Sequence, residues 1–582
     1  MMNIKITGLG IVCAIGNDAP SVLKSLREKK GGVAPIKYLK TDHMELLAGE
    51  IKLSNDEMKQ ILGIDKDTLV SRTTLMGAIS LRQAVADADV DLTGKKVAVI
   101  SGTTVGGMDI TEQYFQKMKT DDSLLHILDK HDCGPSTRDI VDLAGLKGAE
   151  VITISTACSS ALNSIMVGSE MLRSGEADIV FAGGAEGLSK FHLNGFNTLM
   201  ILDQEQCRPF DKTRAGLNLG EGAAFVTLQR EDDAKHSYAY VRGYGNRCDA
   251  FHQTASSDDG EGAYLAMTDA LRMAGMKPED IQYINAHGTG TPNNDPSESV
   301  AIRRVFGEQY PLVSSTKGFT GHTTSASGSI ETVISILAME NDFVPASYGW
   351  KEQDEACITP TQGVDNVKLE NVLCNSFGFG GNDSSLIISS LPPASDAADE
   401  AAIRYESKVV AESVIDDEEQ LKDYREFISP MEARRMGKLM KAVTLTSMRA
   451  LKAAGIECPD AIIASTAQGM LETSVKFLDD IDFNGEQLLK PTLFMQSTHN
   501  TLGSSIAIRT KCHGYNITFT HEDKSFELAL RDAERLIATG KVNNVLVGYH
   551  EESIPLYQDF ARRQGRPVPQ LVYSKSVVLV RK

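Results

Sequence analysis

The stretch VITISTACSSALNSIMVGSEMLRSGEADIVFAGGAE, residues 151–186, decides the fold of this chain. It opens on a β-branched run at 151–156, continues as a helical stretch over 159–174, and closes on a second apolar run at 178–184. Apolar, β-branched runs bounded by glycine indicate strands that are buried on both faces. The strand–helix–strand order therefore predicts an α/β fold around a largely buried sheet.

Cys158 lies in STACSSA, where the first of these strands ends and the helix begins. A helix N-terminus carries partial positive charge and free N–H groups, which favour a thiolate over a thiol. A thiolate there can accept an acyl group and hold it as a thioester. The competing interpretation is a small core cysteine, because free cysteine is among the most buried residue types.

Three further motifs bear on that choice. NAHGTGTPNNDPSE (285–298) contains His287, and SSTKGFTGHTTSASGSIE (314–331) contains His322. Each histidine lies in a Gly/Thr-rich turn rather than on an apolar helix face. CNSFGFGGND (374–383) is a Gly-rich turn of the kind that lets the backbone approach a ligand closely.

Taken together, TACSSA, NAHGTGT, STKGFTGH and NSFGFGG, in this order and at these spacings, resemble the β-ketoacyl-carrier-protein synthase family of the thiolase superfamily, in its elongating FabF-type (KAS II-like) branch. RPFDKTRAGLNLGEGAA (208–224) and CDAFHQT (248–254) match as well, so the resemblance covers residues 1 to about 390. It implies a thiolase-like α/β core, duplicated and arranged in five αβαβα layers.

The resemblance also implies a reaction. Cys158 would take an acyl chain from a carrier-protein thioester; a malonyl carrier protein would then lose carbon dioxide, and its carbanion would attack the acyl thioester. Neutral His287 and His322 would stabilise the charge on the thioester oxygen, and the N–H groups of Cys158 and Phe379 would form the second oxyanion hole. The remaining residues implied are Lys317 with its acid Glu331, the gating Phe379, the pantetheine contacts Thr289 and Thr291, and the substrate contacts Val105, Met108 and Phe377. No cofactor and no metal are implied, since the substrates ride on the phosphopantetheine of acyl carrier protein.

Besides Ala215, where Asp is usual in RxxD-G, the sequence departs from the family pattern in two motifs next to site residues. The usual GGTN reads GGND at 380–383, which adds an acid behind Phe379, and the small-residue stretch after the second histidine reads TTSASGS at 323–329. Neither change removes a catalytic atom, so they bear on substrate preference more than on activity.

The chain contains an internal repeat. TISTACSSALNSIMVGSEMLRSGEADIVFAGGAE resembles TFTHEDKSFELALRDAERLIATGKVNNVLVGYHE at an offset of 365 residues, with Asp523 opposite Cys158. Three more pairs keep this register: Gly175 with Gly540, Gly183 with Gly548, and Glu186 with Glu551. The second copy resembles the degenerate chain-length-factor proteins of aryl-polyene and type II polyketide pathways, which lack the nucleophile and close the acyl tunnel of an active subunit. His521–Glu522–Asp523 could also be a metal or acid–base cluster, although adjacent residues rarely converge on one ion.

These observations divide the chain into four parts: a synthase N-terminal half at 1–240 with the nucleophile, a C-terminal half at 241–391 with both histidines, a Pro/Ala/acid-rich linker at 392–405, and a degenerate N-terminal-like domain at 406–582. Condensing enzymes of this family dimerise through the strand before the nucleophile, so a homodimer is expected. Either the extra domain replaces the partner, with YNITFT beside VITIST, or it is a lateral appendage on an ordinary homodimer.

Bulk composition limits the partners. The formal net charge is −19, which argues against nucleic acid or an anionic membrane, and no apolar run approaches the length that crosses a bilayer. Nine scattered cysteines without a CxxC spacing suggest neither disulfides nor zinc, so we expect a reduced, cytoplasmic location.

Two other functions stay open from sequence. A non-catalytic scaffold or chain-length factor for another synthase would usually lack the cysteine that stands at 158. A thiolase-like acyltransferase using coenzyme A would carry a second catalytic cysteine, where this chain reads GFGGND.

Overall fold

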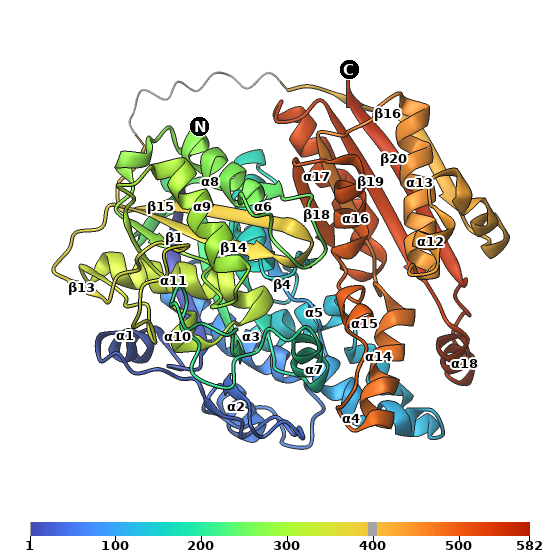
Figure 1. Ribbon diagram of the computed structural model, residues 1–582, viewed down its shortest axis with the longest axis horizontal. Coiled ribbons are helices and arrows are strands. Elements are labelled where there is room, and N and C mark those ends of the chain that lie inside the picture. The colour runs from blue at the N-terminus through green and yellow to red at the C-terminus, as the bar shows by residue number, and fades with distance from the viewer. Residues whose placement is uncertain (1, 394–403) are drawn as a thin grey trace.

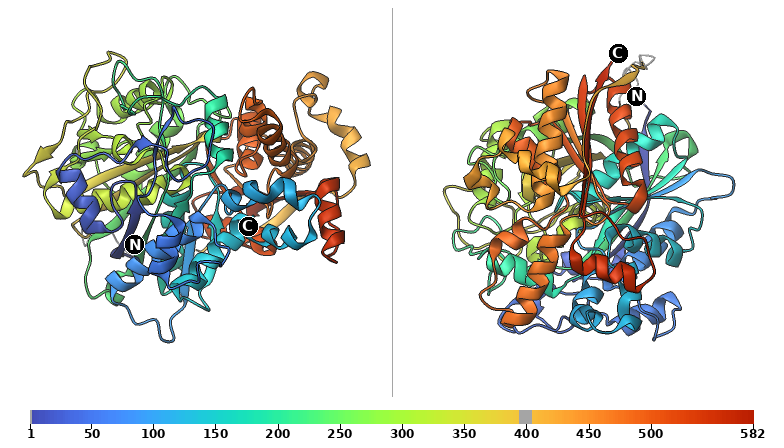
Figure 2. Two further views of the ribbon diagram at one scale, coloured as in Figure 1. Left: turned by 90° about the horizontal axis from the view of Figure 1, so that it is seen from below. Right: turned by 90° about the vertical axis from the view of Figure 1, so that its right-hand side faces the viewer.

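A computed structural model describes residues 2–393 and 404–582 of the chain. Residues 2–393 form one body, and residues 404–582, the C-terminal domain, lie against one side of it (Figure 1). Figure 2 shows the same arrangement from two further directions. Most of the predicted linker, at 394–403, lies outside the described residues. None of the helices in the described part is both long and apolar enough to span a bilayer.

One continuous sheet of fifteen strands runs through the described residues of both parts. Its order is β11 (Leu312–Ser314), β10 (Tyr283–Asn285), β14 (Asn371–Gly378), β15 (Asn382–Ser389), β9 (Ala239–Cys248), β1 (Ile4–Cys13), β8 (Gly222–Arg230), β6 (Ile179–Glu186), β4 (Val97–Gly102), β5 (Glu150–Ile154), β18 (Tyr515–Phe519), β17 (Ala461–Ser465), β19 (Asn544–Glu552), β20 (Val572–Arg581) and β16 (Ser407–Ile415). Small sheets join β2 (Ala34–Pro35), β3 (Leu47–Gly49) and β7 (Leu219–Gly220), and β12 (Phe343–Val344) with β13 (Val364–Asp365).

The body formed by residues 2–393 has five layers. Two helices fill the middle and contact both halves of the sheet, and further helices cover each outer face. The middle helices are α6 (Ser160–Ser174) and α11 (Ser327–Glu340); the outer ones are α3 (Arg72–Ala88) and α5 (Cys133–Ala144) on one side and α8 (Glu261–Ala274) with α9 (Asn294–Phe306) on the other. This confirms the predicted thiolase-like core, with one addition: β9 pairs with both β1 and β15 and so joins the two halves into a single sheet.

The remaining helices connect these layers or cover their edges. They are α1 (Ala19–Arg27), α2 (Asn55–Leu62), α4 (Met108–Met118), α7 (Lys190–Thr198), α10 (Lys317–Thr320), α12 (Pro430–Ala433), α13 (Lys438–Ala454), α14 (Leu471–Asn484), α15 (Pro491–Met495), α16 (Thr501–Thr510), α17 (Ser525–Ala538) and α18 (Pro555–Arg563).

The C-terminal domain repeats the first half of that body. Its strand order β18–β17–β19–β20–β16 matches β5–β4–β6–β8–β1. The residues kept in both copies have physical roles. Gly175 and Gly540 follow the equivalent helices α6 and α17 with φ of 76° and 69°, a conformation that favours glycine. Glu186 and Glu551 each accept backbone N–H groups of the loop that follows the neighbouring strand.

β18 of the C-terminal domain extends the sheet beyond β5, antiparallel to it. The Ser155 N–H donates to the Thr518 carbonyl and the Thr520 N–H to the Thr153 carbonyl, both at 3.0 Å. The prediction that YNITFT lies beside VITIST is therefore confirmed. The alternative prediction, that the extra domain is a lateral appendage on an ordinary homodimer, is wrong. The edge through which a homodimer was expected is occupied by the chain's own C-terminal domain.

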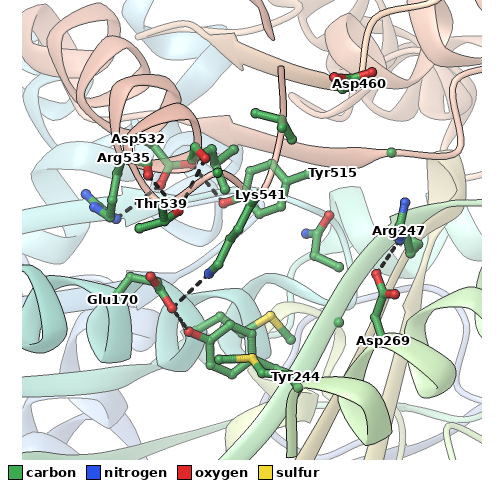
Figure 3. Close-up of a pocket in the computed structure, with 18 of the residues that line it drawn as sticks. Glu170, Tyr244, Arg247, Asp269, Asp460, Tyr515, Asp532, Arg535, Thr539 and Lys541 are labelled. Atoms are coloured by element: carbon green, nitrogen blue, oxygen red, sulfur yellow. Dashed lines mark hydrogen bonds and ion pairs between the residues drawn. The ribbon is translucent and has the colours of Figure 1, made fainter. Parts of the chain in front are cut away.

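A cavity of about 760 Å³ lies along this seam, with charged side chains from both parts around it (Figure 3). Glu170 of α6 forms an ion pair with Lys541, with Nζ 2.9 Å from Oε1, and accepts a hydrogen bond from the Tyr244 hydroxyl. Burial opposes ionisation of Glu170, but Lys541 and Arg173 outweigh it and lower the pKa of the carboxyl to about 2. The Lys541–Glu170 and Arg535–Glu176 ion pairs cross the seam, so this cluster helps to hold the two parts together.

Candidate active site

Cys158 sits in a sharp turn between β5 and α6. Ala157 has φ of 51°, and the thiol is buried. Burial raises the pKa of the Cys158 thiol to about 12, although the Lys317 charge and the Phe379 N–H act in the opposite direction. The expectation that the helix N-terminus makes a thiolate is therefore wrong for the resting chain, because desolvation outweighs the modest effect of a helix end.

Both histidines meet Cys158 in one buried site. His322 Nε2 lies 3.1 Å from the Cys158 sulfur, and the ring of His287 lies 5.3 Å from that of His322. Burial, together with the Lys317 charge, lowers the pKa of both imidazoles well below its usual value. Both rings are thus neutral at pH 7, as the sequence predicted, and His322 Nε2 is placed to exchange a proton with the sulfur.

Lys317 and Glu331 form a buried ion pair beside the histidines. Nζ lies 2.5 Å from Oε1 and both side chains are almost fully enclosed. Burial raises the pKa of Glu331 to about 7, with Lys317 opposing the rise. The pairing predicted from the sequence is present, and Lys317 faces its acid rather than the Cys158 sulfur.

A cavity of about 320 Å³ opens onto the Cys158 sulfur. Its lining includes both histidines, Thr289, Thr291, Phe377 and Phe379. The Thr289 and Thr291 hydroxyls are 2.9 Å apart, so they offer a paired donor and acceptor along its wall. Phe379 stacks on Phe196, with ring centroids 5.5 Å apart.

Val105 and Met108 lie outside this cavity. They line a second space of about 40 Å³, together with Phe191 and His192 of α7 and with Phe494 and His499 of the C-terminal domain. Phe196 lines the first space and His192 the second, and their ring centroids are 6.2 Å apart. We call these two adjacent rings, one from each lining, the partition. Val105 and Met108 therefore lie beside the Cys158 cavity rather than in its wall.

Phe494 was not predicted from the sequence. It is buried against Phe196, with ring centroids 5.3 Å apart, and a Cβ at Gly195 would lie 2.1 Å from its ring. The C-terminal domain therefore contributes a side chain to the surroundings of the site. No motif marks Phe494, because its neighbours lie about 300 residues away in sequence.

The two departures from the family pattern are accommodated. Burial, with Asp249 and Glu298 nearby, raises the pKa of Asp383 well above its ordinary value, so its surroundings oppose ionisation of the extra acid. In TTSASGS, the Ser327 hydroxyl lies 3.1 Å from His322 Nδ1, where it bears on the tautomer of that ring.

The donor atoms of Cys158, His287 and His322 lie within 4.8 Å of one another, and one thiol with two imidazoles is a set that can bind zinc. The Lys317 charge, which depresses the pKa of both imidazoles, opposes a cation there. The side chains of His521, Glu522 and Asp523, the possible metal or acid–base cluster of the second copy, do not converge on one point. His521 Nδ1 contacts the Thr153 hydroxyl at 3.0 Å and Glu522 pairs with Arg138, while Asp523 faces a different cavity.

A buried Cys–His–His site on a duplicated thiolase-like core defines a class of acyl-transferring condensing enzymes, and comparison with known proteins gives the family. Models described as Beta-ketoacyl synthase, N-terminal domain, match residues 1–234 and again 409–580, and one described as Beta-ketoacyl synthase, C-terminal domain, matches 238–351. The chain belongs to the β-ketoacyl synthase family.

Among its relatives are proteins named 3-oxoacyl-[acyl-carrier-protein] synthase 2. The Coxiella burnetii protein is 34% identical over 421 residues, and the Vibrio cholerae protein 32% over 417; each match covers 66% of this chain and 98% of the relative. These relatives are about as long as the synthase part of the chain alone, since each is matched almost completely by two thirds of this chain.

Solved structures extend the likeness to the whole chain. A structure titled PfaC Keto synthase-Chain length factor matches all of this chain and 78% of its own, with a TM-score of 0.80 at 17% identity, which supports the fold alone. The ketosynthase ApeO in complex with its chain length factor ApeC, from Xenorhabdus doucetiae, matches 67% of this chain and 98% of its own at 30% identity and a TM-score of 0.59.

Proposed function

We propose that this chain is a 3-oxoacyl-[acyl-carrier-protein] synthase that condenses malonyl-carrier protein with an acyl group held on Cys158. The observation that carries the proposal is the 3.1 Å contact between the Cys158 sulfur and His322 Nε2, with His287 beside it in one buried cavity. Relatives of that name at about a third identity support it.

In the first step, the Cys158 sulfur attacks the thioester carbon of acyl-carrier protein. A new C–S bond forms, the old one breaks, and the carrier thiol leaves with the proton that Cys158 gives up. Because the resting thiol is protonated, His322 Nε2 takes that proton and then returns it to the leaving sulfur. The N–H groups of Cys158 and Phe379 stabilise the oxyanion of the tetrahedral intermediate.

In the second step, the bond between the malonyl methylene and its carboxylate breaks and carbon dioxide leaves. The released electron pair forms the new C–C bond to the acyl carbon, and Cys158 departs as the leaving group and takes up one proton. Negative charge on the malonyl thioester oxygen is stabilised by the neutral imidazoles of His287 and His322. His322 accepts a proton at Nε2 in the first step, so it donates here only after its own proton has moved from Nδ1 to Nε2, and the Ser327 hydroxyl 3.1 Å from Nδ1 is placed to take up the Nδ1 proton. The step balances without an external oxidant or reductant, and Lys317 with Glu331 orders the site.

The C-terminal domain, in this proposal, is a built-in chain-length factor. Phe494 closes the small space lined by Val105 and Met108, next to the partition that bounds the Cys158 cavity. Movement of Phe196 and Phe379 would join the two spaces into one acyl pocket that ends on Phe494. We accordingly propose a monomer with one active site, in which β18 takes the place of a partner strand.

Acyl carrier protein is the proposed partner, with Thr289 and Thr291 on its pantetheine arm and Phe377 on the substrate. The likeness to the ketosynthase ApeO, solved in complex with its chain length factor, favours a polyene or polyketide-like pathway over general fatty-acid elongation. The cytoplasm remains the proposed location, since all nine cysteines are free thiols.

The test is to incubate the chain with acyl- and malonyl-carrier protein and follow the 3-oxoacyl product, with Cys158→Ala in parallel. Product from the wild-type chain and none from Cys158→Ala is the expected result. Neither product nor acylation of Cys158 would favour the scaffold role. Product from acetyl-coenzyme A without carrier protein would favour a thiolase-type reaction.

A further inference from the structure

A buried asparagine of the C-terminal domain contacts the turn that carries Phe379. Asn500 precedes α16 as its N-cap residue, yet its side chain makes no cap bond to that helix. Instead, Asn500 Nδ2 donates to the Phe379 carbonyl and to Asn382 Oδ1, both at 2.7 Å. Asparagine is a preferred cap residue, so the diversion of its amide across the seam is unusual.

The orientation of the Asn500 amide follows from its neighbours. The Asn516 carbonyl can only accept a hydrogen bond, and Asn382 Nδ2 lies 3.0 Å from it. Asn382 therefore directs its Oδ1 toward Asn500, and Asn500 donates a hydrogen bond to it from Nδ2. Asn500 is fully buried, and its Oδ1 has no hydrogen-bond partner among the described residues. The desolvation of that oxygen is unfavourable and opposes the gain from the two Nδ2 bonds.

The same asparagines reach the nucleophile turn from the other side. Asn246 joins Asn516 to Asn163, with bonds of 2.8 Å from the Asn516 N–H to Asn246 Oδ1 and of 2.8 Å from Asn246 Nδ2 to Asn163 Oδ1. Asn163 Nδ2 then donates to the Thr156 hydroxyl at 2.8 Å, two residues before Cys158. The buried network thus links the C-terminal domain to both sides of the proposed oxyanion hole.

Close packing on both sides also restricts the backbone of the Phe379 turn. A Cβ at Gly380 would meet Ser504 Oγ at 2.7 Å and Asn500 Nδ2 at 2.8 Å, and a Cβ at Gly378 would meet the Thr156 carbonyl at 2.8 Å. The turn is therefore clamped between the nucleophile turn and α16. The Phe379 N–H faces the Cys158 sulfur while the Phe379 carbonyl faces Asn500.

We propose that Asn500 is a positioning residue for the reaction at Cys158, because it holds the Phe379 turn so that the Phe379 N–H points at the oxyanion of the acyl-transfer step. This inference rests on the proposed function. It gives the degenerate domain a second task besides closing the acyl pocket: the domain completes the active site from outside.

The discriminating variant is Asn500→Asp, which keeps the shape but sets a carboxylate oxygen against two acceptor oxygens. Cys158 acylation by acyl-carrier protein should slow at least about tenfold, since a misplaced oxyanion donor is costly. Decarboxylation of malonyl-carrier protein, measured on chain whose Cys158 is capped with iodoacetamide, should stay within about twofold because its charge develops at the histidines. Ser504→Ala is the matched control, since it lies in the same helix against the same turn and its hydroxyl has no partner in the described part of the chain.

A fall of both rates together, or of neither, would overturn the inference. If Asn500→Asp does not fold, Asn500→Ser decides: slowed acylation with unchanged decarboxylation supports the inference, and wild-type acylation overturns it. A wild-type chain that neither acylates Cys158 nor releases carbon dioxide would instead overturn the proposed function, and this inference with it.

Discussion

At the scale of single residues, burial has a larger effect on the pKa values of Cys158, His287 and His322 than any neighbouring charge has. Desolvation keeps the Cys158 thiol protonated and both imidazoles neutral, so the chemistry begins from an uncharged triad. The charge in the site belongs to Lys317 and Glu331, whose side chains are almost fully enclosed. Such a pair stabilises little when intact, but leaves a buried charge when one member is lost.

Glu331→Gln should therefore destabilise the chain by about 3 kcal/mol, because the buried Lys317 ammonium loses its counter-charge. The measurement is the free energy of unfolding in urea. Lys368→Met is the control, since it breaks only the exposed pair with Glu370 and should lower the free energy of unfolding far less than Glu331→Gln does. Equal losses in the two variants would contradict this view of the site.

At the scale of elements, the sequence predicted the strands and the helix around Cys158, whose bounds depend on nearby residues. β5, α6 and β6 lie within about two residues of the predicted spans, because continuous apolar runs and the glycines that bound them determine such elements locally. The gathering of Cys158, His287 and His322 followed from motifs of a known family. Phe494 and Asn500 could not be predicted, since each acts only through contacts formed when the two copies of the fold pack together.

Phe494→Ala should let longer acyl chains into the pocket, because it removes the ring that closes the space beside Val105 and Met108. We expect kcat/KM for acyl chains beyond the wild-type limit to rise about tenfold, which is the value of one or two methylenes in an apolar pocket. The check is the product distribution with carrier-bound acyl chains of increasing length.

Phe477→Ala is the matched control for that variant. Phe477 is fully buried and packs against Phe494, with ring centroids 6.0 Å apart, but is not among the residues that line the space. Both variants should lose stability as large-to-small core changes do. Longer products from Phe477→Ala as well would mean that loosened packing, rather than the Phe494 ring, sets the limit.

At the scale of the whole molecule, a ketoacyl synthase carries a second N-terminal-like domain that extends its own sheet. The repeat in the sequence predicted which strands would meet, and β18 does pair with β5. The charges that secure the seam were not predictable, because Glu170, Tyr244 and Lys541 come from distant parts of the sequence.

Acid should loosen this seam in a defined range. The pKa of Glu170 is lowered from 4.5 to about 2, so its contribution is complete above pH 4.5 and is lost as the pH falls toward 2. Between pH 5 and pH 3 the wild-type chain should lose about 2 kcal/mol more unfolding free energy than Glu170→Gln. Guanidinium unfolding at the two pH values measures this, and identical losses would rule out the role given to Glu170.

Native mass spectrometry of the chain after incubation with acyl-carrier protein measures the number of subunits and the acylation of Cys158 together. We predict a monomer of 63.1 kDa that carries a single acyl group on Cys158, and an unmodified monomer for Cys158→Ala. A homodimer, an acyl group on the C-terminal domain, or a wild-type chain without any acyl group would contradict this prediction.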